Sequence, residues 1–286
     1  MSREEFSETS GLSGTRPPAV AGIFYSSDPE ELRGTVRVLL EDARRRKEEE
    51  LATARSQRRH PLAVIAPHAG YMYSGQVAAT AYAYLELAAG HIDSVAVIGP
   101  SHRVPLKGLA LSSAKFFKMP GFRLSADEEA IEELRRKGLA EFADAAHAAE
   151  HSIEVHFPFI WDVLGPVRVV AIAAGEASAE EVGCAVETLL QNSRRVVVVS
   201  SDLSHYLDYE SAVRVDTATI QAILDLRYEA IGYDHACGRT AIRGILWCAR
   251  QNGMRPEVLD LRNSGDTAGP RESVVGYPAV AFWPNS

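Results

Sequence analysis

The sequence contains few cysteines and no long hydrophobic run, and both absences limit where the protein can work. Its 3 cysteines are Cys184, Cys237 and Cys248, an odd number with no paired spacing. Such a set does not form a disulfide framework and is typical of a reducing compartment. No apolar stretch approaches the roughly 20 residues that a membrane-spanning helix needs, and the polar, acidic residues 1–8 are unlike a secretory signal. These features predict a soluble, cytoplasmic protein without a membrane partner.

The chain also lacks an excess of basic residues and several well-known catalytic motifs. Lys and Arg number 30 against 38 Asp and Glu, giving a net charge of −8. This balance argues against a nucleic-acid partner, which would require a basic face. No Gly-x-Gly-x-x-Gly or Walker loop occurs, which disfavours a nucleotide cofactor. No Gly-x-Ser-x-Gly elbow occurs either, so a hydrolase using Ser101 or Cys237 as nucleophile is a minor alternative.

What the sequence does contain is three Val- and Ile-rich runs that each stop at a loop with a histidine. Residues 62–66, 95–98 and 196–199 are followed by His68, His102 and His205. Continuous apolar runs of this length are typical of strands buried on both faces. Loops that leave the carboxyl ends of parallel strands gather along one edge of a sheet. The three histidines are therefore candidates for one shared site.

Between these runs, strand-like and helix-like patterns alternate to the end of the chain. The alternation and the lack of internal linkers predict one α/β domain over residues 16–286, after a disordered, polar leader at 1–15. Helix-start signals occur at Ser27-Asp28-Pro29, at the capping-box pattern Ser125–Glu128, and at residue 178. A further helix over about 240–250 leads to closing strands at 257–262 and 273–283.

Single residues in these loops suggest specific chemistry. His68 and His102 lie in Gly- and Pro-flanked loops that can present a neutral imidazole to a metal; taken singly, each could also be a structural histidine. The spacing of Asp202 and His205 allows the carboxylate to hold one ring nitrogen, or else the two residues begin a helix.

Cys237 precedes a predicted helix start and neighbours a cation, which would lower its thiol pKa. Cys184 and Cys248 fit helix packing instead.

A second group of polar residues interrupts an apolar stretch. Glu150, His151, Glu154 and His156 lie within seven positions, but the order does not match the His-Glu-x-x-His zinc motif. On a strand, His151 and His156 would point to opposite faces. The sequence therefore favours a supporting role for this group over direct metal binding.

Seven ordered segments between about residues 16 and 283 resemble the Memo family, whose prokaryotic members are called AmmeMemoRadiSam system protein B. They are Pro18–Tyr25, Ala66–Tyr71, Gly99–His102, Glu150–Glu154, Ser200–Asp202 with His205, Cys237–Arg239 and Ser273–Tyr277. The resemblance implies an α/β/α sandwich with a mostly parallel or mixed central sheet, similar to class III extradiol dioxygenases. It also implies functional association with a radical-SAM protein and an AMMECR-type protein.

The resemblance further implies a set of site residues. Class III extradiol dioxygenases hold non-haem iron with two histidines and a carboxylate, and a further histidine moves protons. His68 and His102 match the ligand histidines, His205 matches the proton-moving position, and Cys237 stands where the carboxylate would be. A thiolate is softer than a carboxylate and shifts the preference toward copper or zinc. Iron or copper, with zinc as a third option, is therefore the expected cofactor.

The leading hypothesis is metal-dependent redox chemistry on an unknown substrate. In it, His68, His102 and Cys237 hold the metal, Asp202 orients His205, and His205 moves a proton. The main alternative is a non-enzymatic binding protein that uses the same pocket for a peptide or small molecule.

Overall fold

The apolar runs of the sequence form the centre of one sheet. The computed structural model describes residues 12–285. Strands β2 (Ala63–Ala66), β9 (Arg195–Ser200), β3 (Ser94–Pro100) and β8 (Arg168–Ala174) lie next to one another in this order, and all are parallel. Every residue of β2, β3 and β9 is buried, as expected for strands covered on both faces. The three loops therefore leave the same edge of the sheet.

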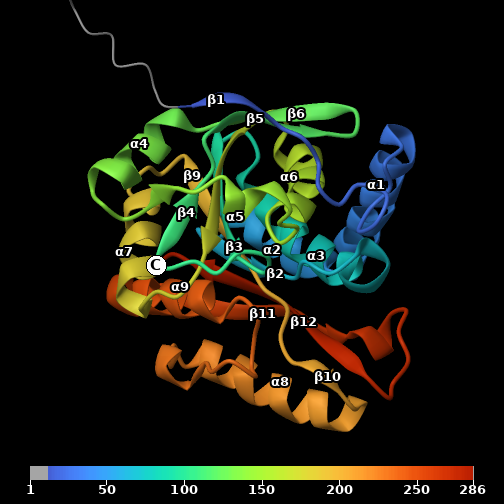
Figure 1. The fold of residues 1–286 in the computed structure, drawn as a ribbon. Coiled ribbons are helices and arrows are strands. Elements are labelled where there is room, and N and C mark those ends of the chain that lie inside the picture. Colours follow the sequence, from blue (N-terminus) through green and yellow to red (C-terminus); the bar gives the residue numbers. More distant parts are fainter. Residues whose placement is uncertain (1–11, 286) are drawn as a thin grey trace, which may run out of the picture.

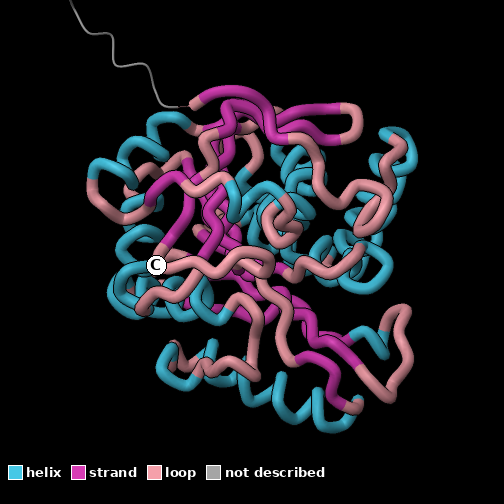
Figure 2. Tube along the Cα trace, viewed as in Figure 1, coloured by secondary structure: helices cyan, strands magenta, loops and turns pink. Residues whose placement is uncertain are grey.

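Within residues 12–285 the sheet is mixed and has 12 strands in the order β1-β5-β6-β8-β3-β9-β2-β12-β10, with β11, β4 and β7 paired to its sides. Figure 2 shows these strands running as one layer through the molecule. The remaining strands are β1 (Ser13–Arg16), β4 (Leu109–Leu111), β5 (Ala114–Met119), β6 (Phe122–Ala126), β7 (Glu141–Phe142), β10 (His205–Leu207), β11 (Arg255–Asn263) and β12 (Val274–Trp283). The antiparallel β11–β12 pair corresponds to the two closing strands expected from the sequence.

Helices cover both faces of this sheet and complete the predicted α/β/α sandwich (Figure 1). Helix α3 packs against β2 and β12 and is itself covered by α1 and α6, whereas α7 and α9 pack together over β3 and β9. The helices are α1 (Pro29–Arg46), α2 (Glu48–Ser56), α3 (Tyr71–Leu85), α4 (Glu128–Arg136), α5 (Ala145–Ala148), α6 (Phe157–Leu164), α7 (Ala179–Leu190), α8 (Tyr209–Leu224) and α9 (Arg239–Asn252). Short 3-10 turns span Glu86–Ala88, Glu154–His156, Tyr228–Ala230 and Ser264–Asp266. No helix in the described part of the chain is long and apolar enough to cross a membrane.

The helix-start signals are mostly confirmed. Asp28 accepts hydrogen bonds from the first turn of α1, with a proline at the first helical position. Ser178 and Glu181 form a reciprocal capping box on α7. The box expected at Ser125 is wrong, because Ser125 lies in β6 and the helix is capped by Asp127 two residues later. A strand that continues to residue 126 leaves Ser125 no access to the helix amides.

The predicted leader falls mainly outside the described residues, at positions 1–11. Its last residues differ from the prediction: Leu12 is buried, and Ser13–Arg16 forms strand β1, parallel to β5. The polar composition that suggested disorder is that of an edge strand whose side chains face outward. Arg16 then begins a segment that packs beside the histidine loops.

Candidate metal centre

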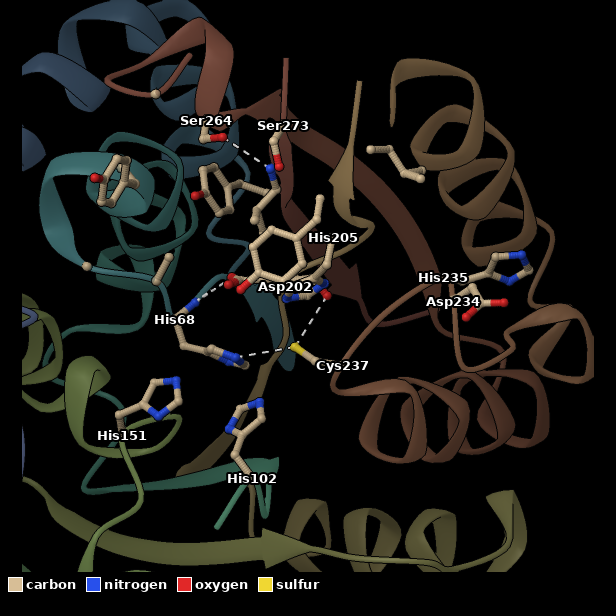
Figure 3. Close-up of a pocket in the computed structure, with 18 of the residues that line it drawn as sticks. His68, His102, His151, Asp202, His205, Asp234, His235, Cys237, Ser264 and Ser273 are labelled. Atoms are coloured by element: carbon tan, nitrogen blue, oxygen red, sulfur yellow. Dashed lines mark hydrogen bonds between the residues drawn. The ribbon is translucent and has the colours of Figure 1, made fainter. Parts of the chain in front are cut away.

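Three histidine rings meet at the carboxyl edge of the central strands. His68 follows β2 and His102 follows β3, each by two residues, and His151 enters from the loop between α5 and α6. The ring centroids of His68 lie 5.2 Å from His102 and 5.3 Å from His151, and those of His102 and His151 are 4.7 Å apart. One ring nitrogen of each lies within 4.8 Å of those of the other two. Figure 3 shows the three rings facing a common space.

The first of these rings, His68, is buried and fully partnered. Its backbone N–H donates to Asp202 at 2.9 Å, Nδ1 lies 2.6 Å from the Ser200 hydroxyl, and Nε2 lies 3.3 Å from the Cys237 sulfur. Burial lowers the pKa of His68 well below its usual value, and the neighbouring histidines lower it further. The ring is therefore neutral at pH 7, the form that binds metals.

The second ring, His102, is held by a buried carboxylate. Glu150 accepts the His102 backbone N–H at 2.6 Å and lies 2.9 Å from His102 Nδ1. Burial opposes ionisation of Glu150, but the hydrogen bonds from His102 and from the Ser152 backbone lower its pKa to about 2. An ionised carboxylate behind a histidine is the usual arrangement at protein metal sites.

The third ring, His151, is the residue that the sequence assigned to a supporting role. It stacks on His102 with 15° between the ring planes, and its Nδ1 lies 3.3 Å from Glu150 Oε1 without forming a hydrogen bond. Burial lowers its pKa to about 4. The segment is neither a strand nor a regular helix, so the face argument from the sequence does not apply. Its spacing partner His156 is fully buried elsewhere, with neither ring nitrogen hydrogen-bonded.

Cys237 lies where the sequence placed it, just before α9, but in a different electrostatic setting. Its sulfur contacts His68 Nε2 at 3.3 Å and the Asp202 carbonyl at 3.7 Å. The expected low thiol pKa is wrong: burial, and next the Asp202 carboxylate, raise the pKa of Cys237 to about 12. The neighbouring cation, Arg239, instead stacks on Tyr233 and pairs with Glu176.

Asp202 and His205 do not form the pair that their spacing suggested. The Asp202 carboxylate accepts backbone N–H groups of His68 and Ala69, and burial raises its pKa to about 7 despite those bonds. The His205 ring instead bonds to the Leu203 carbonyl, and burial lowers its pKa. His205 begins β10, which pairs with β12, so neither the carboxylate–imidazole pair nor the alternative helix start is present. Both side chains nevertheless line the same cavity.

The cavity in front of the histidines has a volume of about 1150 Å³, enough for a sizeable organic ligand. Its lining includes all three clustered histidines together with Asp202, His205 and Cys237. Arg103 and two highly exposed tyrosines, Tyr206 and Tyr233, line it as well. Tyr206 has a backbone φ of +60°, a conformation that non-glycine residues rarely adopt and that occurs often at functional sites.

The serines near the histidines are not placed as nucleophiles. The Ser101 hydroxyl donates to the Val104 carbonyl and that of Ser200 to the Ser152 carbonyl. The Ser201 hydroxyl donates to the Asp202 carbonyl. A hydroxyl committed to a carbonyl cannot pass its proton to a histidine base, so the geometry gives no support to a serine hydrolase.

The donor set fits a metal ion with borderline ligand preferences. One buried, one half-buried and one more exposed imidazole, with a thiol beside them, suit iron, copper or zinc better than magnesium or calcium. The unpaired Nδ1 of His151 is a buried polar atom that lacks a partner among the described residues. Glu150 supplies a buried negative charge directly behind the rings.

Comparison with known proteins identifies the family. The family model described as Memo-like protein matches residues 16–281. The chain belongs to the Memo family. A "MEMO1 family protein" of Sulfolobus acidocaldarius is 34% identical over 281 residues, covering 93% of this chain and 99% of the relative. Proteins of the same name from Saccharolobus islandicus and Sulfurisphaera tokodaii are each 33% identical over similar spans. These matches confirm the Memo resemblance seen in the sequence.

Two contributors to this Memo-family site were missed from the sequence. Ser200 was given no role beyond its place in the Memo-like segment Ser200–Asp202, although its hydroxyl contacts His68. His151 was set aside because its spacing fitted no zinc motif. The signal that could have found it is its neighbour Glu150, since a Glu-His pair in an apolar stretch offers both a ligand and the carboxylate to orient ligands.

Proposed function

We propose that the histidine cluster is a metal centre and that the protein performs iron- or copper-dependent redox chemistry on a substrate held in the adjoining cavity. The observation that carries this proposal is the convergence of His68, His102 and His151 within 4.8 Å at the floor of a large cavity. The Cys237 sulfur, 3.3 Å from His68 Nε2, is a further candidate ligand. A bound iron or copper ion would supply one-electron exchange and open coordination positions.

The protein's own residues have separate roles in this proposal. His68, His102 and His151 present ring nitrogens to the metal, those of His68 and His151 kept neutral by burial, and Asp202 fixes the His68 loop through two backbone N–H groups. His205, neutral because of its burial, lines the cavity and can take up a proton from a substrate group there. The cavity walls bind and orient the substrate and limit water around it. We further propose a cytoplasmic location and functional association with a radical-SAM protein and an AMMECR-type protein.

Element analysis of protein purified without chelator tests the ligands. We expect metal content to fall at least fourfold in His68→Ala and His151→Ala, and to remain unchanged in His91→Ala, an exposed histidine outside the cluster. Cys237→Ser tests the thiol, with Cys248→Ser as a matched control because Cys248 is buried in α9. Equal metal content in all variants would refute the metal centre.

A second candidate function is binding without catalysis. The exposed tyrosines Tyr206 and Tyr233 and the size of the cavity favour it, because such surfaces hold ligands well without any chemistry. Oxygen consumption by metal-loaded protein with a reductant distinguishes the two: turnover that disappears with His205→Ala and with chelation supports the redox function. Ligand binding that survives chelation, without oxygen consumption, supports the binding function.

A further inference from the structure

We propose that Glu150 and Ser200 are positioning residues that hold His102 and His68 in the tautomer protonated at Nδ1, so that both rings offer Nε2 to a metal. This inference rests on the proposed metal centre and adds the residues that determine which nitrogen binds. The structural basis is the turn Glu150–Ser152. The Glu150 carboxylate contacts the His102 ring directly, and the Ser152 carbonyl accepts the hydroxyl of Ser200, which contacts the His68 ring.

The case for His102 follows from the contacts of Glu150, all of which come from donors. Its carboxylate accepts backbone N–H groups from His102, His151 and Ser152 at 2.6–3.0 Å. His102 Nδ1 lies 2.9 Å from the same carboxylate. A carboxylate surrounded by donors is itself only an acceptor, so the proton between the two groups belongs to His102 Nδ1. In this tautomer, Nε2 carries the free lone pair.

The case for His68 follows from the single proton of the Ser200 hydroxyl. Ser200 Oγ lies 2.5 Å from the Ser152 carbonyl, which can only accept, so the hydroxyl proton points there. At 2.6 Å from His68 Nδ1, the same oxygen must therefore accept, and Nδ1 must carry a proton. Nε2 is left unprotonated and faces the Cys237 sulfur.

The carboxylate of Glu150 also supplies charge to the cluster. It is almost fully buried, and within residues 12–285 its only ion-pair partners are His102 and His151. Arg16 contacts the main-chain carbonyl of Glu150, not the carboxylate. A buried negative charge without a Lys or Arg partner is costly. A cation bound across the two imidazoles would offset this cost, which favours metal binding at the Nε2 side of the rings.

Both arrangements meet in one turn. Ser152 donates its backbone N–H to Glu150 and accepts the Ser200 hydroxyl through its carbonyl, while the Ser152 hydroxyl donates to the Pro100 carbonyl at the end of β3. A Cβ on Gly99 would lie 2.6 Å from the Ser152 hydroxyl, so the turn is packed directly against β3. Three residues thus contribute the third histidine, the orienting carboxylate and the carbonyl that orders Ser200.

The tautomers can be observed directly in the metal-free wild-type protein. Long-range ¹H–¹⁵N correlation spectra of the imidazoles distinguish Nδ1–H from Nε2–H forms. We expect His68 and His102 to be Nδ1–H tautomers, with His102 becoming a mixture in Glu150→Gln and His68 becoming a mixture in Ser200→Ala. Nε2–H forms in the wild type would overturn the proposal, whatever the variants do.

Metal affinity gives the second measurement, with Co²⁺ as the probe in a spectroscopic titration. We expect Glu150→Gln and Ser200→Ala to bind Co²⁺ about 10–100-fold more weakly than wild type. The matched controls are Asp127→Asn and Ser112→Ala, buried residues outside the cavity, which should bind within about twofold of wild type. Affinity within threefold of wild type in both test variants would overturn the positioning role.

The two proposals fail in different ways. Assigned tautomers in a wild-type protein that binds no Co²⁺ would overturn the metal centre and not the hydrogen-bond assignment. Nε2–H tautomers together with intact Co²⁺ binding would overturn the assignment and not the metal centre. Thermal unfolding of each variant, followed by circular dichroism, shows whether a lost affinity reflects the site or the fold.

Discussion

Replacing Glu154 by alanine should detach the segment that follows β1 from the rest of the molecule. This carboxylate is fully buried and accepts four hydrogen bonds from that segment: from the Arg16 guanidinium at 2.6 Å, the backbone N–H groups of Ala19 and Val20, and the Tyr25 hydroxyl. The alanine variant removes the shared acceptor of all four donors, leaving the Arg16 and Tyr25 donors only long contacts to the Pro17 carbonyl and the Met119 sulfur, and it leaves the Arg16 charge without its carboxylate. No other single side chain in the described residues holds this segment by so many bonds.

Two routes give a similar magnitude for the loss. Removing one partner of a buried ion pair costs about 3–5 kcal/mol, because the other charge stays buried and unpaired. Four hydrogen bonds at about 0.5–1.5 kcal/mol each give about 2–6 kcal/mol. We therefore expect Glu154→Ala to lower the free energy of unfolding by about 4 kcal/mol, a large part of the total stability of an ordinary domain.

Urea unfolding measured by circular dichroism checks this value, and hydrogen exchange at the Ala19 and Val20 amides checks its origin. Glu154→Gln is the matched control: it keeps one carbonyl acceptor but loses the charge, so its loss should be intermediate. A loss below about 1 kcal/mol in the alanine variant, with both amides still protected, would refute the reasoning. Because the Phe24 ring in this segment lies 4.6 Å from that of His151, we also expect weaker Co²⁺ binding.

Three further predictions concern stability. Burial lowers the pKa of His147 to about 4 and that of His156 to about 3, so in the folded protein both stay neutral while the unfolded chain takes up protons near pH 6.5. Stability should therefore fall as the pH falls below 6.5, by about 4 kcal/mol for the two together between pH 7.5 and 5, and an unchanged urea midpoint would contradict this. Gly244→Ala should cost about 1–3 kcal/mol in thermal unfolding, because a Cβ there would lie 2.3 Å from Val182 where α9 crosses α7. Asp28→Ala should cost about 1 kcal/mol by urea unfolding, since it removes the cap of α1, whereas Asp28→Asn should be nearly neutral.

The parts of the fold that were predictable are those governed by local pattern. Apolar runs located β2, β3 and β9, and the histidine loops after β2 and β3 meet because parallel strands place their carboxyl ends together. The elements that escaped prediction depend on contacts distant in sequence. The polar residues 13–16 form an edge strand only because β5, about 100 residues later, is available to pair with them.

In the site too, the residues set by local pattern were predictable from the sequence, and those set by distant contacts were not. His68 and His102 are supplied by two strands that flank β9, so sheet topology alone brings them together. His151 arrives from a turn outside that pattern, and only the three-dimensional path of the chain places it on His102.

The pairing of Asp202 with His205 failed for a related reason. Spacing shows which side chains could meet but not which backbone groups lack a partner within the backbone. Here the amides of the His68 loop donate to the buried Asp202 carboxylate instead. A tight loop at the end of a strand leaves backbone N–H groups without backbone acceptors. A nearby buried carboxylate accepts their hydrogen bonds, and in the case of Asp202 it is then not free to bond a histidine ring. For the same reason, Glu150 bonds three backbone amides as well as His102. Buried carboxylates next to such histidine loops are therefore better assigned by counting unpaired amides than by their spacing to a histidine.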